Sequence, residues 1–214
     1  TVFLYTFEQR ERCYNIFELV TGARLTTSYT RVGGLGWDVP ENFREVVLDF
    51  TAQFPDAMRE VERLLTRNRI WIDRTKGIGV ISAEDAIDWN MTGPMLRGSG
   101  IGYDIRKAEP FLSFPDYDFD IPVGENGDTY DRYLVRMEEV NQSMRIIEQA
   151  VNNLPSGPVK VDDAKVILPE KKEVDFGMES LIHHFKVIMD GHGLTPPIGD
   201  SYLPTEAPNG ELGF

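Results

Sequence analysis

The chain has 214 residues, of which 41% are hydrophobic and 27% charged, and its formal net charge at pH 7 is −13. This acidity argues against unaided binding to nucleic acid or to anionic lipid, because nothing offsets the repulsion from phosphate groups. A single cysteine, Cys13, excludes a disulfide framework and a cluster ligated by cysteines of this chain alone. Cys13 lies in an apolar helical pattern, so we expect it to be a small buried hydrophobic residue. No segment has the length and apolarity of a membrane span or signal peptide, so any membrane role would depend on partner proteins.

Hydrophobic periodicity and capping residues predict a mainly α-helical chain with small α+β edges, built as a helical bundle. Residues 25–32 resemble an irregular strand or loop, residues 93–124 a loop with short strands, and residues 158–174 a connector, and the tail from Gly191 is expected to be extended. Ser82 is expected to cap a short helix, and Asp128 and Asp131 to cap the longest one, whose apolar stripe marks it as core or subunit interface. Helices are expected over residues 2–20, 40–54, 55–66, 82–89, 128–154 and 177–189.

The segment 92–107, TGPMLRGSGIGYDIRK, is unusually rich in glycine. It lacks the last glycine of a dinucleotide fingerprint, the Gly-Lys-Ser/Thr of a P-loop and the spacing of a hydrolase nucleophile elbow. Two interpretations remain: a tight loop that packs against its own domain, or a backbone surface for a cofactor or partner. The segment contains Gly93, Gly98, Gly100 and Gly102, with the basic residues Arg97, Arg106 and Lys107.

Candidate metal ligands do not form a convincing site. Residues 116–120, DYDFD, start like a calcium loop, but Ile121 occupies the position that needs glycine. His183 and His184 are adjacent on a predicted helix, about 100° apart, so they cannot chelate one ion from the same face. His192 lies between two glycines with no obvious second ligand. We therefore expect neither a calcium nor a zinc site.

The best functional candidate is the block from Arg24 to Gly34. Arg24 and Arg31 flank a run of hydrogen-bond donors, Thr26-Thr27-Ser28-Tyr29. Donors and positive charge near an iron–sulfur cluster stabilise its reduced form and raise its potential. The alternative is a strand whose hydroxyl groups satisfy buried backbone.

Six blocks spread along the chain resemble the signature blocks of one family. The longest is the glycine-rich segment, and the six occur in the family's order from one end of the chain to the other. The family is that of the D-type subunits of respiratory complex I, hydrogenase-large-subunit-like proteins of NADH-quinone oxidoreductase. The blocks are residues 22–34 (GAR followed by YTRVGG), 68–79 (NRIW and RTKGIG), 92–107, 128–139 (DTYDRYLVRMEE), 178–186 (MESLIHHFK) and 206–213 (EAPNGELG).

The resemblance implies a helical bundle of the type found in hydrogenase large subunits and in the D-type subunits of complex I. Because members of the family are longer at both ends, residues 1–214 are expected to be the central and C-terminal-side part of one domain of such a protein. Within it we expect a helical part with a cluster-facing loop (residues 1–90), a glycine-rich loop region (91–126), and a long helix with a connector (127–214).

The resemblance also implies a function. The chain would be a subunit of a proton-translocating NADH-quinone oxidoreductase that passes electrons from the terminal iron–sulfur cluster of a B-type partner to quinone and forms part of the quinone cavity. NADH would be used by the whole complex, and the isolated chain would be inactive. Partners would include the B-type and C-type subunits, at the cytoplasmic face of the inner cell membrane.

For the site, the resemblance places Arg24, Thr26 and Arg31 near the partner's cluster. Thr26 stands where several other members carry a histidine that couples cluster reduction to protonation. Threonine donates a hydrogen bond but does not titrate near neutral pH, so we expect a cluster potential with weak pH dependence. The family's quinone-headgroup histidine, tyrosine and aspartate precede the first residue here and have no counterpart in the chain.

Two other functions remain open. A membrane-bound [NiFe] hydrogenase-type large subunit needs terminal Cys-x-x-Cys pairs, and Cys13 alone supplies none. A non-catalytic scaffold that has lost its redox role is the second alternative.

Overall fold

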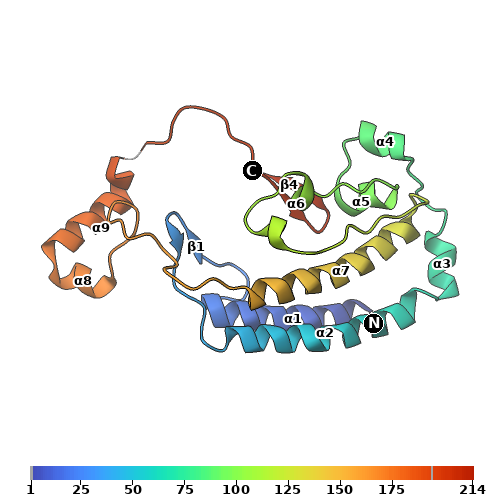
Figure 1. Ribbon diagram of the computed structural model, residues 1–214, viewed down its shortest axis with the longest axis horizontal. Helices are drawn as coiled ribbons and strands as arrows, with labels where there is room; N and C mark the ends of the chain where they lie inside the picture. Colours follow the sequence, from blue (N-terminus) through green and yellow to red (C-terminus); the bar gives the residue numbers. More distant parts are fainter. Residues whose placement is uncertain (1, 194) are drawn as a thin grey trace. The chain divides into compact units, whose positions relative to one another are not determined.

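Helices dominate the structure, a computed structural model that describes residues 2–193 and 195–214 (Figure 1). The described strands form two antiparallel hairpins, β1 (Thr30–Arg31) with β2 (Gly34–Leu35) and β3 (Pro204–Ala207) with β4 (Gly210–Gly213). The prediction of a mainly helical chain with small β edges is confirmed. The helices are α1 (Val2–Thr21), α2 (Phe43–Leu65), α3 (Arg69–Thr75), α4 (Ala83–Asp88), α5 (Gly93–Gly98), α6 (Ile105–Ala108), the 3-10 turn η1 (Phe114–Asp116), α7 (Thr129–Asn152), α8 (Lys171–Phe176), α9 (Met178–Asp190) and the 3-10 turn η2 (Gly191–Gly193).

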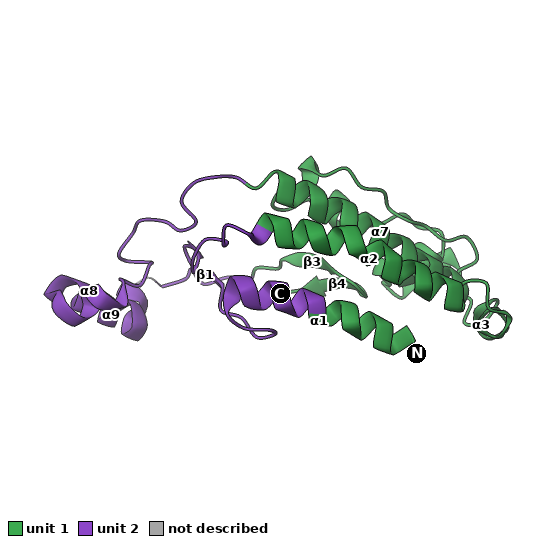
Figure 2. Cartoon of the chain, turned by 90° about the horizontal axis from the view of Figure 1, so that it is seen from below, with its two compact units in different colours: residues 1–11, 44–154, 201–214 green, residues 12–43, 155–200 purple. Residues whose placement is uncertain are grey.

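The chain divides into two compact units (Figure 2). Unit 1 comprises residues 1–11, 44–154 and 201–214, and unit 2 comprises residues 12–43 and 155–200. Helix α1 contributes residues to both. Over the described ranges 2–193 and 195–214, no helix combines the length and apolarity needed to cross a membrane.

In unit 1, α2 and α7 run antiparallel. The start of α2 meets the end of α7, where Arg44 donates to Asn152 Oδ1 at 2.7 Å. At the opposite end, the hydroxyl of Tyr130 donates to the carbonyl of Thr66 at 2.8 Å, and the hydroxyls of Thr66 and Tyr133 lie 2.9 Å apart. Contacts at both ends fix the register of the pair, and α5 packs against α7 as well.

Helix α2 corrects a prediction. Two helices divided at Pro55 were expected, but one helix passes through Pro55. Proline lacks the N–H that would bond to the residue four positions earlier, and this usually kinks or ends a helix. Here Phe50 and Val61 are buried on either side of the proline, so the buried face continues across it. The ring centroids of Phe50 and Phe54 lie 5.3 Å apart just before the proline.

The region 93–124 also differs from its prediction, because it forms the helical turns α5, α6 and η1 instead of short strands. Pro94 lies in the first turn of α5, where a missing N–H costs nothing. Asp104 caps α6 by accepting from the backbone N–H of Arg106 at 2.9 Å. Of the two interpretations of the glycines, close internal packing fits: a Cβ on Gly93 would lie 2.4 Å from the Cα of Gly210.

Capping predictions are confirmed at two helices. The Ser82 hydroxyl accepts from Asp85 N at the start of α4, and the Asp128 carboxylate accepts from Asp131 N at the start of α7. Asp128 also accepts from Gly77 N at 2.7 Å, which ties the loop after α3 to α7. Asp131 is not a cap: its carboxylate accepts from the backbone N–H groups of Glu125 and Asn126.

Three further predictions need correction. The expected connector 158–174 ends in α8, which begins at Lys171. The tail from Gly191 is not simply extended, since it contains η2 and the β3–β4 hairpin. Cys13 is half-buried, not buried, because it lies on a helix of which Val20 is the only buried residue among those the structure describes.

Candidate functional site

The block from Arg24 to Gly34 begins where α1 ends, in unit 2. Gly22 has a positive φ of +75° and its N–H donates to Glu18 O, a helix ending that glycine adopts without steric cost. The chain then turns back, and Arg24 donates to Asn15 Oδ1 at 2.9 Å and lies 3.4 Å from Glu18 Oε2. Its guanidinium also lies over the Tyr14 ring at 5.6 Å. Arg24 is therefore held against the last turns of α1.

The β1–β2 hairpin positions Arg31. Its Nε donates to the carbonyl of Ser28 at 3.0 Å, and its guanidinium lies over the Trp37 ring, 5.8 Å from the centroid. Trp37 is itself fixed, because its Nε1–H donates to the carbonyl of Val20 at the end of α1. Arg31 is exposed, so the hairpin holds a cation at the surface in a defined orientation.

Residues 159–161 of the connector hold the tip of this hairpin. Gly34 bridges to Lys160, Leu35 N donates to Val159 O at 2.9 Å, and Val161 N donates to Gly33 O at 2.9 Å. A Cβ on Gly34, whose φ is +134°, would lie 2.4 Å from Val159 O. The position therefore needs glycine for both its conformation and its close neighbour.

Tyr29 lies between the two arginines in sequence and packs edge-on against Trp37, with the centroids 5.7 Å apart. Its hydroxyl oxygen is buried and has no hydrogen-bond partner among the described residues. Burial, and next the charge of Asp38, raise the pKa of Tyr29, so the hydroxyl stays protonated as a donor. Thr26, by contrast, is exposed.

The structure thus gives the three predicted residues different surroundings. Arg24 packs against the end of α1, and Arg31 lies over the Trp37 ring. Thr26 is exposed in the loop between them. The loop thus presents exposed hydroxyls and two exposed guanidinium groups at the surface of unit 2. Cys13 is the one thiol of the sequence, so this chain lacks the thiolates to ligate a cluster itself.

In the sequence His192 has no obvious second ligand, but the structure places it beside another histidine. His183 Nδ1 and His192 Nε2 lie 3.4 Å apart, with the rings 5.2 Å centroid to centroid. The contact supplies the neighbour that His192 lacked in the sequence. In residues 2–193 and 195–214 no group of three or more histidine, cysteine, aspartate or glutamate side chains could hold a metal ion.

The glycine-rich segment places Arg97 inside unit 1, with 2% of its surface exposed. Its Nη1 donates to Tyr103 O at 2.9 Å, and its Nη2 lies 2.9 Å from Glu206 Oε1 and 2.5 Å from Glu139 Oε1. Asp104 lies 3.7 Å from Nη1. This acid cluster joins α5, α6, α7 and β3, so the segment organises unit 1 around a buried cation.

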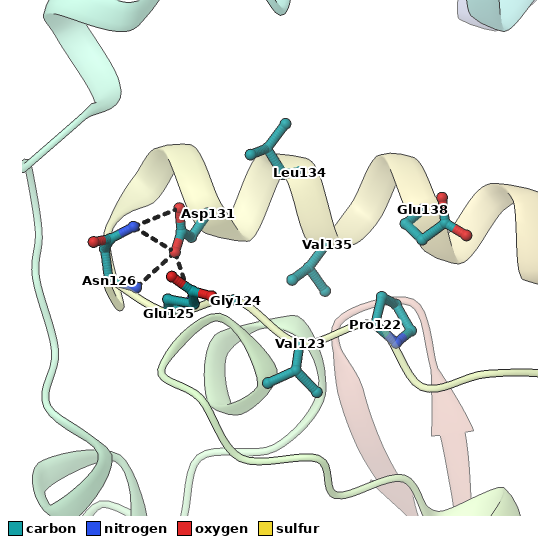
Figure 3. A pocket seen from close by; sticks show the side chains of 9 residues that line it. All are labelled: Pro122, Val123, Gly124, Glu125, Asn126, Asp131, Leu134, Val135 and Glu138. Atoms are coloured by element: carbon teal, nitrogen blue, oxygen red, sulfur yellow. Dashed lines mark hydrogen bonds between the residues drawn. The ribbon is translucent and has the colours of Figure 1, made fainter.

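A hollow of about 500 Å³ lies between α7 and the loop before it (Figure 3). The Asp131 carboxylate faces this loop, with the N–H groups of Glu125 and Asn126 at 2.8 and 2.6 Å and the Asn126 amide at 3.1 Å. Burial alone would raise the pKa of Asp131, but these hydrogen bonds outweigh it and lower the pKa. Its oxygens are occupied by the loop, so Asp131 is a structural anchor.

Comparison with known proteins gives the family. The sequence matches the family described as "Respiratory-chain NADH dehydrogenase, 49 Kd subunit" over residues 1–214. The chain belongs to this family. It is 51% identical over all 214 of its residues to the D subunit of the NADH-quinone oxidoreductase of Methylacidiphilum infernorum, covering 51% of that protein. It is 49% identical to the protein of the same name from Geotalea uraniireducens, covering 54% of it.

A mitochondrial protein is equally similar: the "NADH-ubiquinone oxidoreductase 49 kDa subunit, mitochondrial" of Neurospora crassa is 49% identical over 213 residues, and the chain covers 44% of it. The chain thus spans about half the length of the curated relatives it matches. The resemblance to the D-type subunits of complex I is confirmed as membership of the 49 kDa-subunit family.

Sequence reasoning missed three residues that organise these sites. Trp37, which supports Arg31, follows the glycine-rich turn of residues 33–36, and that turn was the available sign that the chain folds back. Glu139 and Glu206 lie in two of the family's sequence blocks, yet 67 residues separate them, and no local pattern predicts that they share Arg97.

Proposed function

We propose that this chain is part of a D-type subunit of a proton-translocating NADH-quinone oxidoreductase. In that complex the Arg24–Gly34 loop faces the terminal iron–sulfur cluster of a B-type partner, and the subunit forms part of the cavity in which quinone takes up electrons. The C-type subunit is a further neighbour. NADH is oxidised elsewhere in the complex, and the isolated chain is inactive.

The observation that carries this proposal is membership of the 49 kDa-subunit family over the whole chain. The loop supports it independently, because it presents Arg24 and Arg31 in fixed positions with Thr26 exposed between them. Positive charge and donors at such a surface stabilise the reduced cluster relative to the oxidised one. The chain reaches the cytoplasmic face of the inner membrane through its partners.

Purification of the full-length subunit with its native partners tests the proposal. We expect an iron–sulfur B-type subunit to co-purify and the assembly to reduce quinone in an inhibitor-sensitive manner. Partners without a cluster would instead support a scaffold, and hydrogen-dependent activity with a bound nickel centre would support a hydrogenase-type subunit. Either result contradicts the proposal.

Thr26 gives a sharper prediction for the loop. Because threonine does not titrate near neutral pH, the midpoint potential of the cluster should change little with pH. Redox titration of the cluster signal in the assembled complex at several pH values measures this. A slope near 59 mV per pH unit, the value for one proton per electron, would contradict it.

A gain-of-function variant complements that measurement. Thr26→His places an imidazole at the exposed loop position and should introduce a pH-dependent potential near neutral pH. Thr27→His, at the adjacent exposed position, is the matched control and should leave the slope flat. Equal slopes in the two variants would show that position 26 has no special relation to the cluster.

A further inference from the structure

Two carboxylates share one nitrogen of Arg97. Glu206 Oε1 lies 2.9 Å and Glu139 Oε1 2.5 Å from Nη2, and the side chains of Arg97, Glu206 and Glu139 are 2%, 7% and 16% exposed. Like charges that meet in a poorly solvated site repel strongly, and protonation of one acid relieves the repulsion. The geometry therefore sets two buried acids against one cation.

The second arginine of the cluster, Arg106, relieves this imbalance only in part. Arg106 is committed to Asp104, to which it donates from Nε at 3.0 Å and from Nη2 at 2.6 Å. Arg136, on the same helix as Glu139, donates to Pro208 O and Asn209 Oδ1. The charged groups around Glu139 are thus Arg97 from α5, Arg106 from α6, Arg136 from α7 and Glu206 from β3. Asp104, which precedes α6, lies 3.7 Å from Arg97 Nη1.

The cluster also contains buried polar atoms whose hydrogen-bonding capacity the described protein groups do not fill. Among the described residues, the buried Nε of Arg97 has no hydrogen-bond partner, and the buried Oε1 of Glu139 has only its ion-pair contact with Arg97 Nη2. Both residues line a hollow of about 440 Å³, together with Ser143 and Glu206. Buried polar atoms of this kind are normally satisfied by ordered water, which also carries protons.

We propose that Glu139 is a proton-binding site: in the folded protein it holds a proton beside the Arg97–Glu206 ion pair and exchanges it with water in the adjacent hollow. The ligand is the proton itself, and the site is independent of the Arg24–Gly34 loop. With Glu139 neutral, Arg97 and Glu206 balance each other, and Asp104 and Arg106 form the second pair.

The electrostatic balance agrees with this geometry. Burial raises the pKa of Glu139 and the charge of Glu206 raises it further, while Arg97 and then Arg106 offset only part of this increase. A folded pKa above the unfolded value means that the folded state binds more protons between the two values. This contribution to stability is complete below the ordinary glutamate pKa and is lost as pH rises through the folded pKa.

The experiment uses the full-length protein in its native assembly. Infrared difference spectra between mildly acidic and alkaline pH should contain a carboxylic-acid C=O stretching band that disappears in Glu139→Gln. The same band should persist in Glu138→Gln, a neighbouring acid on α7. In Glu206→Gln it should disappear at a lower pH than in the wild type, because Arg97 then stabilises the ionised form of Glu139 without competition.

Thermal unfolding supplies the second readout. Glu139→Gln mimics the protonated carboxyl, so it should assemble normally, and its unfolding midpoint should decline less than that of the wild type as pH rises above the ordinary glutamate pKa. Glu206→Gln should unfold at a lower midpoint than the wild type at neutral pH. The proposal is overturned if the infrared band survives in Glu139→Gln, or if Glu139→Gln prevents assembly or loses as much stability as Glu206→Gln.

Discussion

Among single residues, burial separates Arg97 from Arg145, another arginine that contacts more than one acid. Arg145 donates to Asp118 and Asp120, yet its side chain is 41% exposed and its partners are 86% and 78% exposed. Exposed ion pairs contribute little, because water solvates the separated charges well. Arg97 is 2% exposed, so its loss leaves buried acids without a counter-charge.

This contrast predicts unequal effects of the same substitution. Arg97→Met should lower the free energy of unfolding by about 3–5 kcal/mol, the range for removing one partner from a buried ion pair. Arg145→Met is the matched control and should cost less than about 1 kcal/mol. Denaturant unfolding of both variants measures the difference, and similar losses would show that burial does not set the strength of these contacts.

Among the elements, the β1–β2 hairpin carries the candidate site, and its tip depends on Gly34. The backbone of Val159 lies so close that a Cβ would meet its carbonyl oxygen at 2.4 Å. Gly157 has nearly the same φ, +136° against +134°, but open space where its Cβ would be. Substituting each glycine therefore distinguishes the effect of backbone strain from the effect of a steric clash.

We expect Gly34→Ala and Gly157→Ala to differ in their effects on stability. Both alanines are strained at positive φ, at a cost of about 1–3 kcal/mol, and only Gly34→Ala also pushes against backbone. Gly34→Ala should therefore destabilise unit 2 more and increase hydrogen exchange at Leu35 N and Val161 N, which bond across the contact. Equal exchange in the two variants would show that the connector does not hold the hairpin.

Sequence patterns predicted individual elements better than their relations. Caps such as Ser82 and Asp128 act within a few residues, so their spacing predicted them correctly. Pro55 misled because the buried face of α2 outweighs one missing hydrogen bond. Glu139 and Glu206 meet at Arg97 from distant segments, and local spacing contains no information about that contact. Trp37 is close to Arg31 in sequence, and the glycine-rich turn between them was the local sign that was missed.

For the whole molecule, the pH dependence of stability follows from acids whose pKa values are shifted in opposite directions. Burial would raise the pKa of Asp104, but the hydrogen bonds and charge of Arg106 outweigh it and lower the pKa; the loop hydrogen bonds do the same for Asp131. Acids with a lowered folded pKa stabilise the fold above their ordinary pKa, and this contribution is lost as pH falls through the folded value. The pKa of Glu139 is raised instead, so its contribution to stability is lost as pH rises through the folded value.

The thermal midpoint of the full-length protein should therefore fall as pH drops through the lowered pKa values of Asp104 and Asp131, and also fall as pH rises through the raised pKa of Glu139. Asp131→Asn should flatten the acid limb, because it removes a group that must be protonated there. It should also lower the maximum, because the amide accepts less strongly from the Glu125 and Asn126 N–H groups. Asp116→Asn, at an exposed position, is the control and should leave both limbs unchanged. A full acid limb in Asp131→Asn would mean that other carboxylates govern acid unfolding.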